Sequence, residues 1–344
     1  MLPRMLFAGL TIVLLAGCVA TPAAVAPPTA TPTAMDGADA LMPLPAGFDV
    51  EGHRGARGLA PENTLPAFET ALDLGVTTLE LDLHLSADGE LVIWHDDAVP
   101  AEKCRLDPMA AAPVPPDPDD AATPAEALMI RRLTMDQLRR YICDRNPDPG
   151  QFPAQRPVAT DLAGANYRMA TLDELFDFVA RYTTADGKSP AQRAQAAQVQ
   201  FNVETKRKPD NPAAIGDDFD GENPGEFERT LVALIEEYGL QDRVIVQSFD
   251  HRSLQAVARL NPTLQLAALT AGGRAVEAYA ALGATIWSPR ARDLTPDLLD
   301  RAHTAGLRVL PWTVNDPDDM RRFIDLGVDG IITDRPDLLL TLAE

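Results

Sequence analysis

The sequence is poor in cysteine, in basic residues and in long apolar runs. Of its 344 residues only three are cysteine, and 30 Lys and Arg stand against 51 Asp and Glu, for a formal net charge of −21. Such a charge disfavours binding to phosphate backbones and to anionic lipid surfaces, so nucleic acid is not expected as a partner. The apolar run over residues 5–15 is too short to span a membrane comfortably. The length suits one large domain or two ordinary ones.

The N-terminus has the pattern of an export signal. A basic residue, the apolar run and two small residues lead to Cys18, so residues 1–18 are predicted to be a signal peptide. The letters L-A-G-C over residues 15–18 also resemble a bacterial lipobox, which implies cleavage before Cys18, lipidation of its thiol and a diacyl anchor. Plain secretion is the alternative. Residues 19–46, rich in Ala, Pro and Thr, are predicted to be a disordered tether.

The densest group of polar side chains lies between residues 53 and 96. Residues 78–85 alternate leucine with mainly polar residues, which is typical of a strand. Since side chains two apart in a strand share a face, Glu80, Asp82 and His84 point the same way. We expect the two carboxylates to act in the site, and His84, further along the strand, to lie at its rim.

A hairpin is predicted to follow this strand. Asp88-Gly89 is a strong signal for a two-residue hairpin loop, because both residues tolerate positive φ. With that loop, Asp82 lies directly opposite His95, within roughly 5 Å at Cβ. Together with His53, these side chains predict a metal and acid/base site. The alternative is an ordinary hairpin whose polar residues only face solvent.

The motifs of this stretch follow a known order. H-R-G, P-E-N-T, E-x-D, D-G and H-D succeed one another over residues 53–96, and this pattern resembles the N-terminal signature of the glycerophosphodiester phosphodiesterases. The resemblance continues through E-x-K, Q-S-F, W-T-x-N and a closing strand to about residue 336, sparing an insertion at 97–168. It implies hydrolysis of glycerophosphodiesters to sn-glycerol 3-phosphate and an alcohol. It also implies a small-molecule substrate, and no protein partner is predicted.

The resemblance and the chemistry of the side chains together assign the catalytic group. His53 and His95 are the expected proton-transfer residues, and the sequence leaves open which is the acid and which the base. Glu204, from the E-x-K motif, joins Glu80 and Asp82 as a third carboxylate, unless it forms only a surface ion pair. Three oxygen ligands suit one divalent cation, Ca²⁺ or Mg²⁺, better than Zn²⁺. The resemblance implies that the nucleophile is either water or the glycerol hydroxyl of the substrate, and the sequence leaves open which.

A further set of residues is expected to contact the substrate. These are Arg54 and Lys206 on the phosphate, Glu62 and Asn63 beside it, and Phe249 and Trp312 on the glycerol side. Glu62 and Asn63 could equally belong to a helix N-terminus, where polar side chains meet unpaired amides. The two aromatic residues could equally be core residues.

Strands and helices alternate over most of the domain, which is predicted to span residues 47–344. Eight strands suited to parallel pairing predict a TIM (β/α)8 barrel with an extra hairpin strand. A doubly wound open sheet is the second choice, but the Gly-rich residues 52–58 do not match its phosphate-binding fingerprint. The expected strands are 48–53, 78–85, 91–95 (the hairpin return), 199–205, 244–248, 265–269, 285–288, 308–314 and 330–333. The expected helices include 61–75, 134–142, 172–182, 226–238 and 252–259.

The insertion at 97–168 contains the other two cysteines, Cys104 and Cys143. In an exported protein these are predicted to form a disulfide. Closing this loop adds about 4 kcal/mol of stability in the chain-entropy treatment. The resemblance implies that such an insertion covers the mouth of the active site.

Two other functions compete with the leading one. A lysophospholipase D or sphingomyelinase D-like activity on the same barrel would need an apolar groove for an acyl chain, and the sequence does not clearly supply one. A non-catalytic, phosphodiester-binding lipoprotein would explain the anchor, but it would not need both histidines and all three carboxylates. We therefore expect a lipid-anchored enzyme of the bacterial cell envelope, at the outer membrane or the periplasmic face.

Overall fold

The computed structural model describes residues 44–342 except 111 and 113. The predicted signal peptide, Cys18 and nearly all of the predicted tether lie outside the described residues. Among the helices that the structure describes, none combines the length and the hydropathy needed to cross a bilayer.

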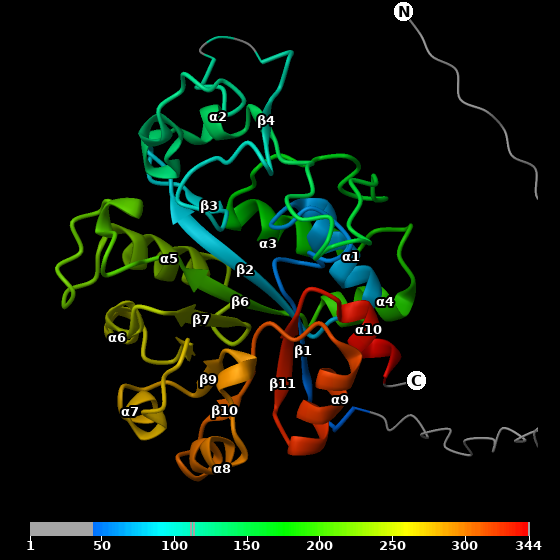
Figure 1. Cartoon of the computed structure of the whole chain (residues 1–344), viewed down its shortest axis with the longest axis vertical. Helices are drawn as coiled ribbons and strands as arrows, with labels where there is room; N and C mark the ends of the chain where they lie inside the picture. The colour runs from blue at the N-terminus through cyan, green and yellow to red at the C-terminus, as the bar shows by residue number, and fades with distance from the viewer. Residues whose placement is uncertain (1–43, 111, 113, 343–344) are drawn as a thin grey trace, which may run out of the picture. The chain divides into compact units, whose positions relative to one another are not determined.

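Eight parallel strands form a nearly closed barrel in the order β10-β9-β8-β7-β6-β2-β1-β11 (Figure 1). They are β1 (Asp49–Gly52), β2 (Thr78–Leu85), β6 (Gln200–Thr205), β7 (Val244–Ser248), β8 (Gln265–Thr270), β9 (Ile286–Pro289), β10 (Arg308–Val309) and β11 (Gly330–Thr333). The first and last strands are neighbours, since β1 pairs with β11 along its whole length. The prediction of a TIM barrel is confirmed.

The barrel closes beyond β10 by single hydrogen bonds. The sequence predicts a strand over 308–314, but β10 covers only Arg308–Val309, and Pro311, which faces β11, has no N–H to donate to it. Backbone bonds from Val314 N to Ile332 O and from Ile332 N to Pro311 O, both 3.1 Å, bridge the remaining gap to β11. These bonds join the two ends of the strand order, although β10 and β11 form no ladder.

Helices follow the strands along the chain. They are α1 (Leu65–Leu74), α3 (Leu172–Tyr182), α4 (Pro190–Ala196), α5 (Glu226–Glu237), α6 (His251–Leu260), α7 (Val276–Ala281), α8 (Pro296–Thr304), α9 (Pro317–Leu326) and α10 (Pro336–Thr341). Helix α1 begins four residues later than predicted, because Thr64 is its N-cap and accepts a hydrogen bond from the Ala67 N–H. Gly75, with φ 92°, ends it.

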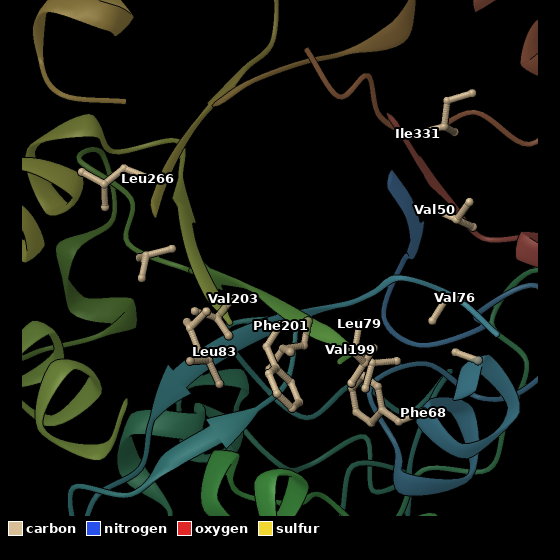
Figure 2. Packing of buried hydrophobic residues seen from close by; sticks show 14 of the residues in the cluster. Val50, Phe68, Val76, Leu79, Leu83, Val199, Phe201, Val203, Leu266 and Ile331 are labelled. Carbon is tan, nitrogen blue, oxygen red and sulfur yellow. The ribbon is translucent and has the colours of Figure 1, made fainter. Parts of the chain in front are cut away.

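Apolar side chains pack on both sides of the strand ring. Figure 2 shows Leu79, Phe201 and Val50 on its outer side, and the first two of these pack toward the same region as Phe68 of α1. Each such fully buried side chain contributes about 1.5–3 kcal/mol of transfer free energy. Inside the ring lies a smaller cluster, made of Ile245, Ala267, Ile286, Leu310 and Ile332. The barrel is thus a packed core.

The hairpin after β2 has a different register from the predicted one. β3 (Leu91–Ile93) pairs with β2 so that Leu85 faces Leu91, and the Trp94 N–H donates to the Asp82 carbonyl at 3.0 Å. Asp82 is therefore opposite Trp94, and the prediction that it faces His95 is wrong. The Ser86 N–H donates to Glu90 O, which leaves a three-residue loop with its last residue, Gly89, at φ 87°.

The insertion carries its own small core, which lies beyond the carboxyl end of β2 (Figure 1). Its elements include α2 (Met135–Leu138) and a two-stranded sheet of β4 (Arg105–Leu106) and β5 (Tyr141–Ile142). The predicted helix 134–142 is wrong after Leu138, because Tyr141 and Ile142 pair with β4. A disulfide joins Cys104 to Cys143, the pair that the sequence predicts.

Candidate active site

One cavity of about 280 Å³ lies at the carboxyl ends of the barrel strands, where TIM-barrel enzymes carry their active sites. It is lined by His53, Arg54, Arg57, Glu80, His95, Glu204, Lys206, Gln247, Phe249, Leu269, Trp312, Thr313 and Ile332. Eight of the eleven residues predicted for the catalytic, metal and substrate roles are among them, and the other three, Asp82, Glu62 and Asn63, are not. The sequence-based site and the cavity therefore coincide.

Three buried carboxylates meet at this cavity. Glu80 and Asp82 stand on β2, and the parallel pairing of β2 with β6 places Glu204 beside Asp82. One oxygen from each of the three lies within 4.8 Å of the others. All three side chains are almost completely shielded from solvent. The alternative of a surface ion pair for Glu204 is wrong, since this residue is buried.

The pKa values of the three carboxyl groups in this cluster are shifted in different directions. Burial and the nearby charges of Asp82 and Glu204 raise the pKa of Glu80 well above its usual range. Burial also raises the pKa of Glu204, although Lys206 donates to it at 2.8 Å and opposes the shift. For Asp82 the effect of burial is outweighed by Arg54 and Lys206, so its pKa is lowered. A further cation among the three carboxyl groups would favour their ionised forms.

The carboxylate cluster fits a hard divalent cation. Oδ1 of Asp82 is buried and accepts no hydrogen bond within the described part of the chain, although the Lys206 ammonium lies 3.4 Å away. An acceptor of this kind is costly to bury unless something pairs with it. Carboxylate oxygens are the ligands that Ca²⁺ and Mg²⁺ prefer. Glu80, Asp82 and Glu204 could therefore hold one divalent ion, which would favour the ionised form of all three.

His53 is fixed by a carboxylate from the opposite end of the sequence. Its Nδ1 lies 2.6 Å from Oδ1 of Asp334, which directly follows β11. Its Nε2 lies 3.9 Å from Glu80, so this nitrogen faces the carboxylate cluster. Burial lowers the pKa of His53, and the neighbouring Asp334 opposes that shift. Asn315 donates to the other oxygen of Asp334 at 2.7 Å and holds it in place.

His95 lines the same cavity although the predicted register is wrong. Beyond β3 the chain bends, and the His95 ring lies 3.0 Å from Asp96 through its Nδ1. Burial lowers the pKa of His95, and Asp82 opposes this shift. His84 is completely buried, so its predicted place at the rim is wrong. Its Nε2 lies 3.3 Å from the backbone carbonyl oxygen of His95, so His84 contacts the backbone of that residue.

The loop before α1 brings Arg54 and Asn63 to Asp82, and Glu62 to Arg54. The Arg54 guanidinium lies 3.1 Å from Asp82 and donates to Glu62 at 2.9 Å. The Asn63 amide donates to Asp82 at 2.8 Å. Since Thr64 caps the helix, Glu62 and Asn63 are free to serve the site, and the helix-terminus alternative does not describe their side chains. The Arg54 N–H also donates to Glu80, at 2.9 Å.

Two aromatic rings form one wall of the cavity. Phe249 and Trp312 meet edge to face, with ring centroids 5.5 Å apart. Phe249 is 43% exposed, so the alternative of a core residue is wrong for it. The Trp312 indole N–H donates to the Ser288 carbonyl at 2.9 Å, which fixes its ring. The lining of the cavity therefore includes aromatic rings as well as charged groups.

Several residues of the site have no role in the sequence-based prediction, and three of them contact its charged groups. Asp334 orients His53, Arg57 lines the cavity and lies 2.6 Å from Glu62, and Gln247 donates to Glu80 at 2.7 Å. Asp334 and Gln247 stand at or just after the carboxyl ends of β11 and β7. A polar residue at such a strand end is the signal that could have found them. The position of Arg57 depends on the fold of the loop, and no sequence pattern points to it.

A parallel barrel with paired histidines and a carboxylate cluster at the carboxyl ends of its strands is the design of an α/β-barrel enzyme. The family model of the glycerophosphoryl diester phosphodiesterase family matches residues 53–338. The chain belongs to this family.

Individual relatives carry the same family name. The chain is 29% identical over 295 residues to a glycerophosphodiester phosphodiesterase of Caldanaerobacter subterraneus subsp. tengcongensis, covering 85% of this chain and 96% of that protein. A Bacillus subtilis glycerophosphodiester phosphodiesterase is 27% identical over 303 residues, covering 83% of each.

Solved structures share the fold. A Silicibacter pomeroyi protein assigned as a glycerophosphoryl diester phosphodiesterase superposes with a TM-score of 0.69 at 29% identity, covering 88% of this chain and 95% of that one. An Oleispira antarctica phosphodiesterase, solved in complex with the product sn-glycerol-3-phosphate, superposes with a TM-score of 0.61 at 19% identity, covering 87% and 96%. At that identity the second likeness supports the fold alone.

Proposed function

We propose that the protein hydrolyses glycerophosphodiesters to sn-glycerol 3-phosphate and an alcohol, with one divalent cation, Ca²⁺ or Mg²⁺, held by Glu80, Asp82 and Glu204. The observation that carries the proposal is the convergence of two carboxylate-bound imidazoles and three buried carboxylates on one cavity. Membership of the family supports the same substrate class.

One group of side chains neutralises negative charge on the phosphate, and another transfers protons. When bound, the cation would neutralise charge that develops on the phosphoryl oxygens. Arg54 and Lys206 line the cavity beside the carboxylates and offer cationic donors to the same oxygens. An alkoxide is a poor leaving group, so one imidazole of the pair His53 and His95 donates a proton to it and the other activates the nucleophile. Both rings have one nitrogen bound to a carboxylate, which leaves the second nitrogen for this transfer.

The dimensions of the cavity favour a small substrate. At about 280 Å³ it lies just below the range for small-molecule sites, about 300–1,000 Å³. Its apolar wall consists of Phe249, Leu269, Trp312 and Ile332. This wall suits the carbon atoms of a glycerol unit, and a lysophospholipid would need room for an acyl chain beyond it. We therefore place glycerophosphodiesters ahead of lysophospholipids.

We also propose that the protein is exported and anchored through a lipid on Cys18. The L-A-G-C motif supports this placement, and a disulfide in the insertion suits an oxidising compartment. In the producing bacterium, Cys18→Ser should move the protein from the membrane fraction to the soluble fraction. A wild-type protein found only in the cytosolic fraction would refute the placement.

The reaction is tested by release of glycerol 3-phosphate from glycerophosphocholine and glycerophosphoethanolamine. EDTA should abolish release, and either Ca²⁺ or Mg²⁺ should restore it. His53→Ala and His95→Ala should each lower kcat by about 10²-fold or more, while calorimetry still detects cation binding. His303→Ala is the matched control, because His303 lies outside the cavity and bonds Asp329. Near-normal turnover in both cavity variants would refute the roles of the histidines.

A further inference from the structure

Lys103 belongs to the insertion and contacts residues of the active site. Its ammonium donates to Oε1 of Glu62 at 2.9 Å and to Oδ2 of Asp96. The Lys103 side chain is only 12% exposed, and its ammonium also lies 5.7 Å from the centre of the Trp94 ring. Lys103 does not line the cavity itself. Within the part of the chain that the structure describes, it therefore reaches the residues that line the cavity only through Glu62 and Asp96.

The two carboxylates that Lys103 bridges serve different parts of the site. Asp96 bonds Nδ1 of His95, the expected proton-transfer residue. Glu62 bonds Arg54, the expected phosphate contact. A single ammonium thus connects the proton-transfer side of the site to its phosphate side. Without this connection Asp96, whose side chain is 31% exposed, could turn toward water and leave the His95 ring without its partner.

The backbone of Lys103 is fixed on both sides. Its N–H donates to Pro100 O at 3.2 Å, and its carbonyl accepts from the Arg145 N–H at 3.2 Å. The next residue, Cys104, is joined by the disulfide to Cys143. A lysine side chain loses much rotamer freedom when it is held in one place, so a fixed backbone lowers the cost of presenting it. The insertion is built to hold this ammonium in position.

We propose that Lys103 is a positioning residue for the phosphodiesterase reaction: it holds Asp96 on Nδ1 of His95 and ties both to the Glu62–Arg54 pair, so that the insertion completes the active site. This inference rests on the proposed function. A bond from His95 Nδ1–H to Asp96 leaves Nε2 of His95 without a proton and able to take part in transfer. Lys103 acts through this arrangement and not by touching the substrate.

The test compares Lys103→Met, Lys103→Arg and Lys208→Met. Lys208 is the matched control, because its ammonium also bonds a carboxylate of the inserted segment, Asp97 at 2.7 Å, but contacts neither Glu62 nor Asp96. With glycerophosphocholine, Lys103→Met should lower kcat by about 10- to 100-fold and change KM by less than about two-fold. Lys103→Arg should recover most of kcat. Lys208→Met should stay within about two-fold of the wild type.

A double-mutant cycle shows whether Lys103 acts through Asp96. In an Asp96→Asn background, Lys103→Met should lower kcat by less than about a further two-fold. If the two losses instead multiply, if Lys103→Met raises KM alone, or if it leaves kcat unchanged, the proposal is wrong. Thermal unfolding of each variant separates a loss of kcat from a loss of fold.

A second measurement needs no substrate. The chain has five histidines, so ¹⁵N-histidine spectra at pH 8 can be assigned with His95→Ala. The wild type should show His95 protonated on Nδ1 only, and Lys103→Met should show a mixture of the two tautomers. An unchanged spectrum in Lys103→Met would overturn the positioning role. If the wild type releases no glycerol 3-phosphate, the proposed function fails, whereas this spectrum still reports on the contact between Lys103 and His95.

Discussion

Replacing Asp334 by Asn should disable His53 without emptying the cation site. The Asp334 carboxylate is 1% exposed and lies 2.6 Å from Nδ1 of His53, so the variant loses a buried, charge-assisted hydrogen bond. Such a bond contributes about 1.5–3 kcal/mol. If it orients the imidazole in the transition state, kcat should fall by about 10- to 150-fold at about 1.4 kcal/mol per factor of ten. KM should change little, because Asp334 does not line the cavity.

The same variant should also shift the pH dependence of kcat, in a direction that follows from the pKa of His53. Asp334 raises the pKa of His53 against the larger, lowering effect of burial. Removing the carboxylate therefore favours the neutral ring, and the limb of the kcat profile due to His53 should move to lower pH. The assay is coupled detection of glycerol 3-phosphate from pH 5 to 9, with Asp329→Asn, next to His303, as the control. A kcat within about two-fold of wild type, or a loss of cation affinity equal to the loss of kcat, would refute the reasoning.

Three further predictions concern the cation, the disulfide and acid stability. Glu204→Gln should weaken Ca²⁺ or Mg²⁺ binding by at least about tenfold in calorimetry, since it removes one of three carboxylates. Cys104→Ser with Cys143→Ser should lower the free energy of unfolding in urea by about 4 kcal/mol. The imidazole and ammonium partners of Asp96 outweigh the effect of burial and lower its pKa to about 2. The ionised form therefore stabilises the fold above about pH 4, and Asp96→Asn should flatten the loss of stability between about pH 4 and 2, measured by urea unfolding.

The barrel could be predicted because its signal is local and repeated. Each strand is a short apolar run, and the alternation at residues 78–85 even places Glu80 and Asp82 on one face, as the structure has them. The register of the hairpin could not be predicted in the same way. A two-residue and a three-residue loop both suit Asp88-Gly89, and the hydrogen bond between Ser86 and Glu90 selects the longer one.

The insertion and the partners of the histidines show what local patterns miss. Tyr141 and Ile142 continue an apolar pattern that suits a helix, but β4, 35 residues earlier, takes them into a sheet. Asp334 is 281 residues from His53, and no spacing within either segment indicates that they meet. The residues that do the chemistry could be recognised by type and motif. The residues that orient them are fixed only by the closed fold.

The pairing of β1 with β11 has a consequence for how the protein is made. His53 follows the first barrel strand to leave the ribosome, whereas its partner Asp334 follows the last one. A chain released before residue 330 would lack both the closing strand and the carboxylate that orients His53. Such a fragment could bury many of its apolar residues and still be inert. Activity would thus show that synthesis had passed residue 334.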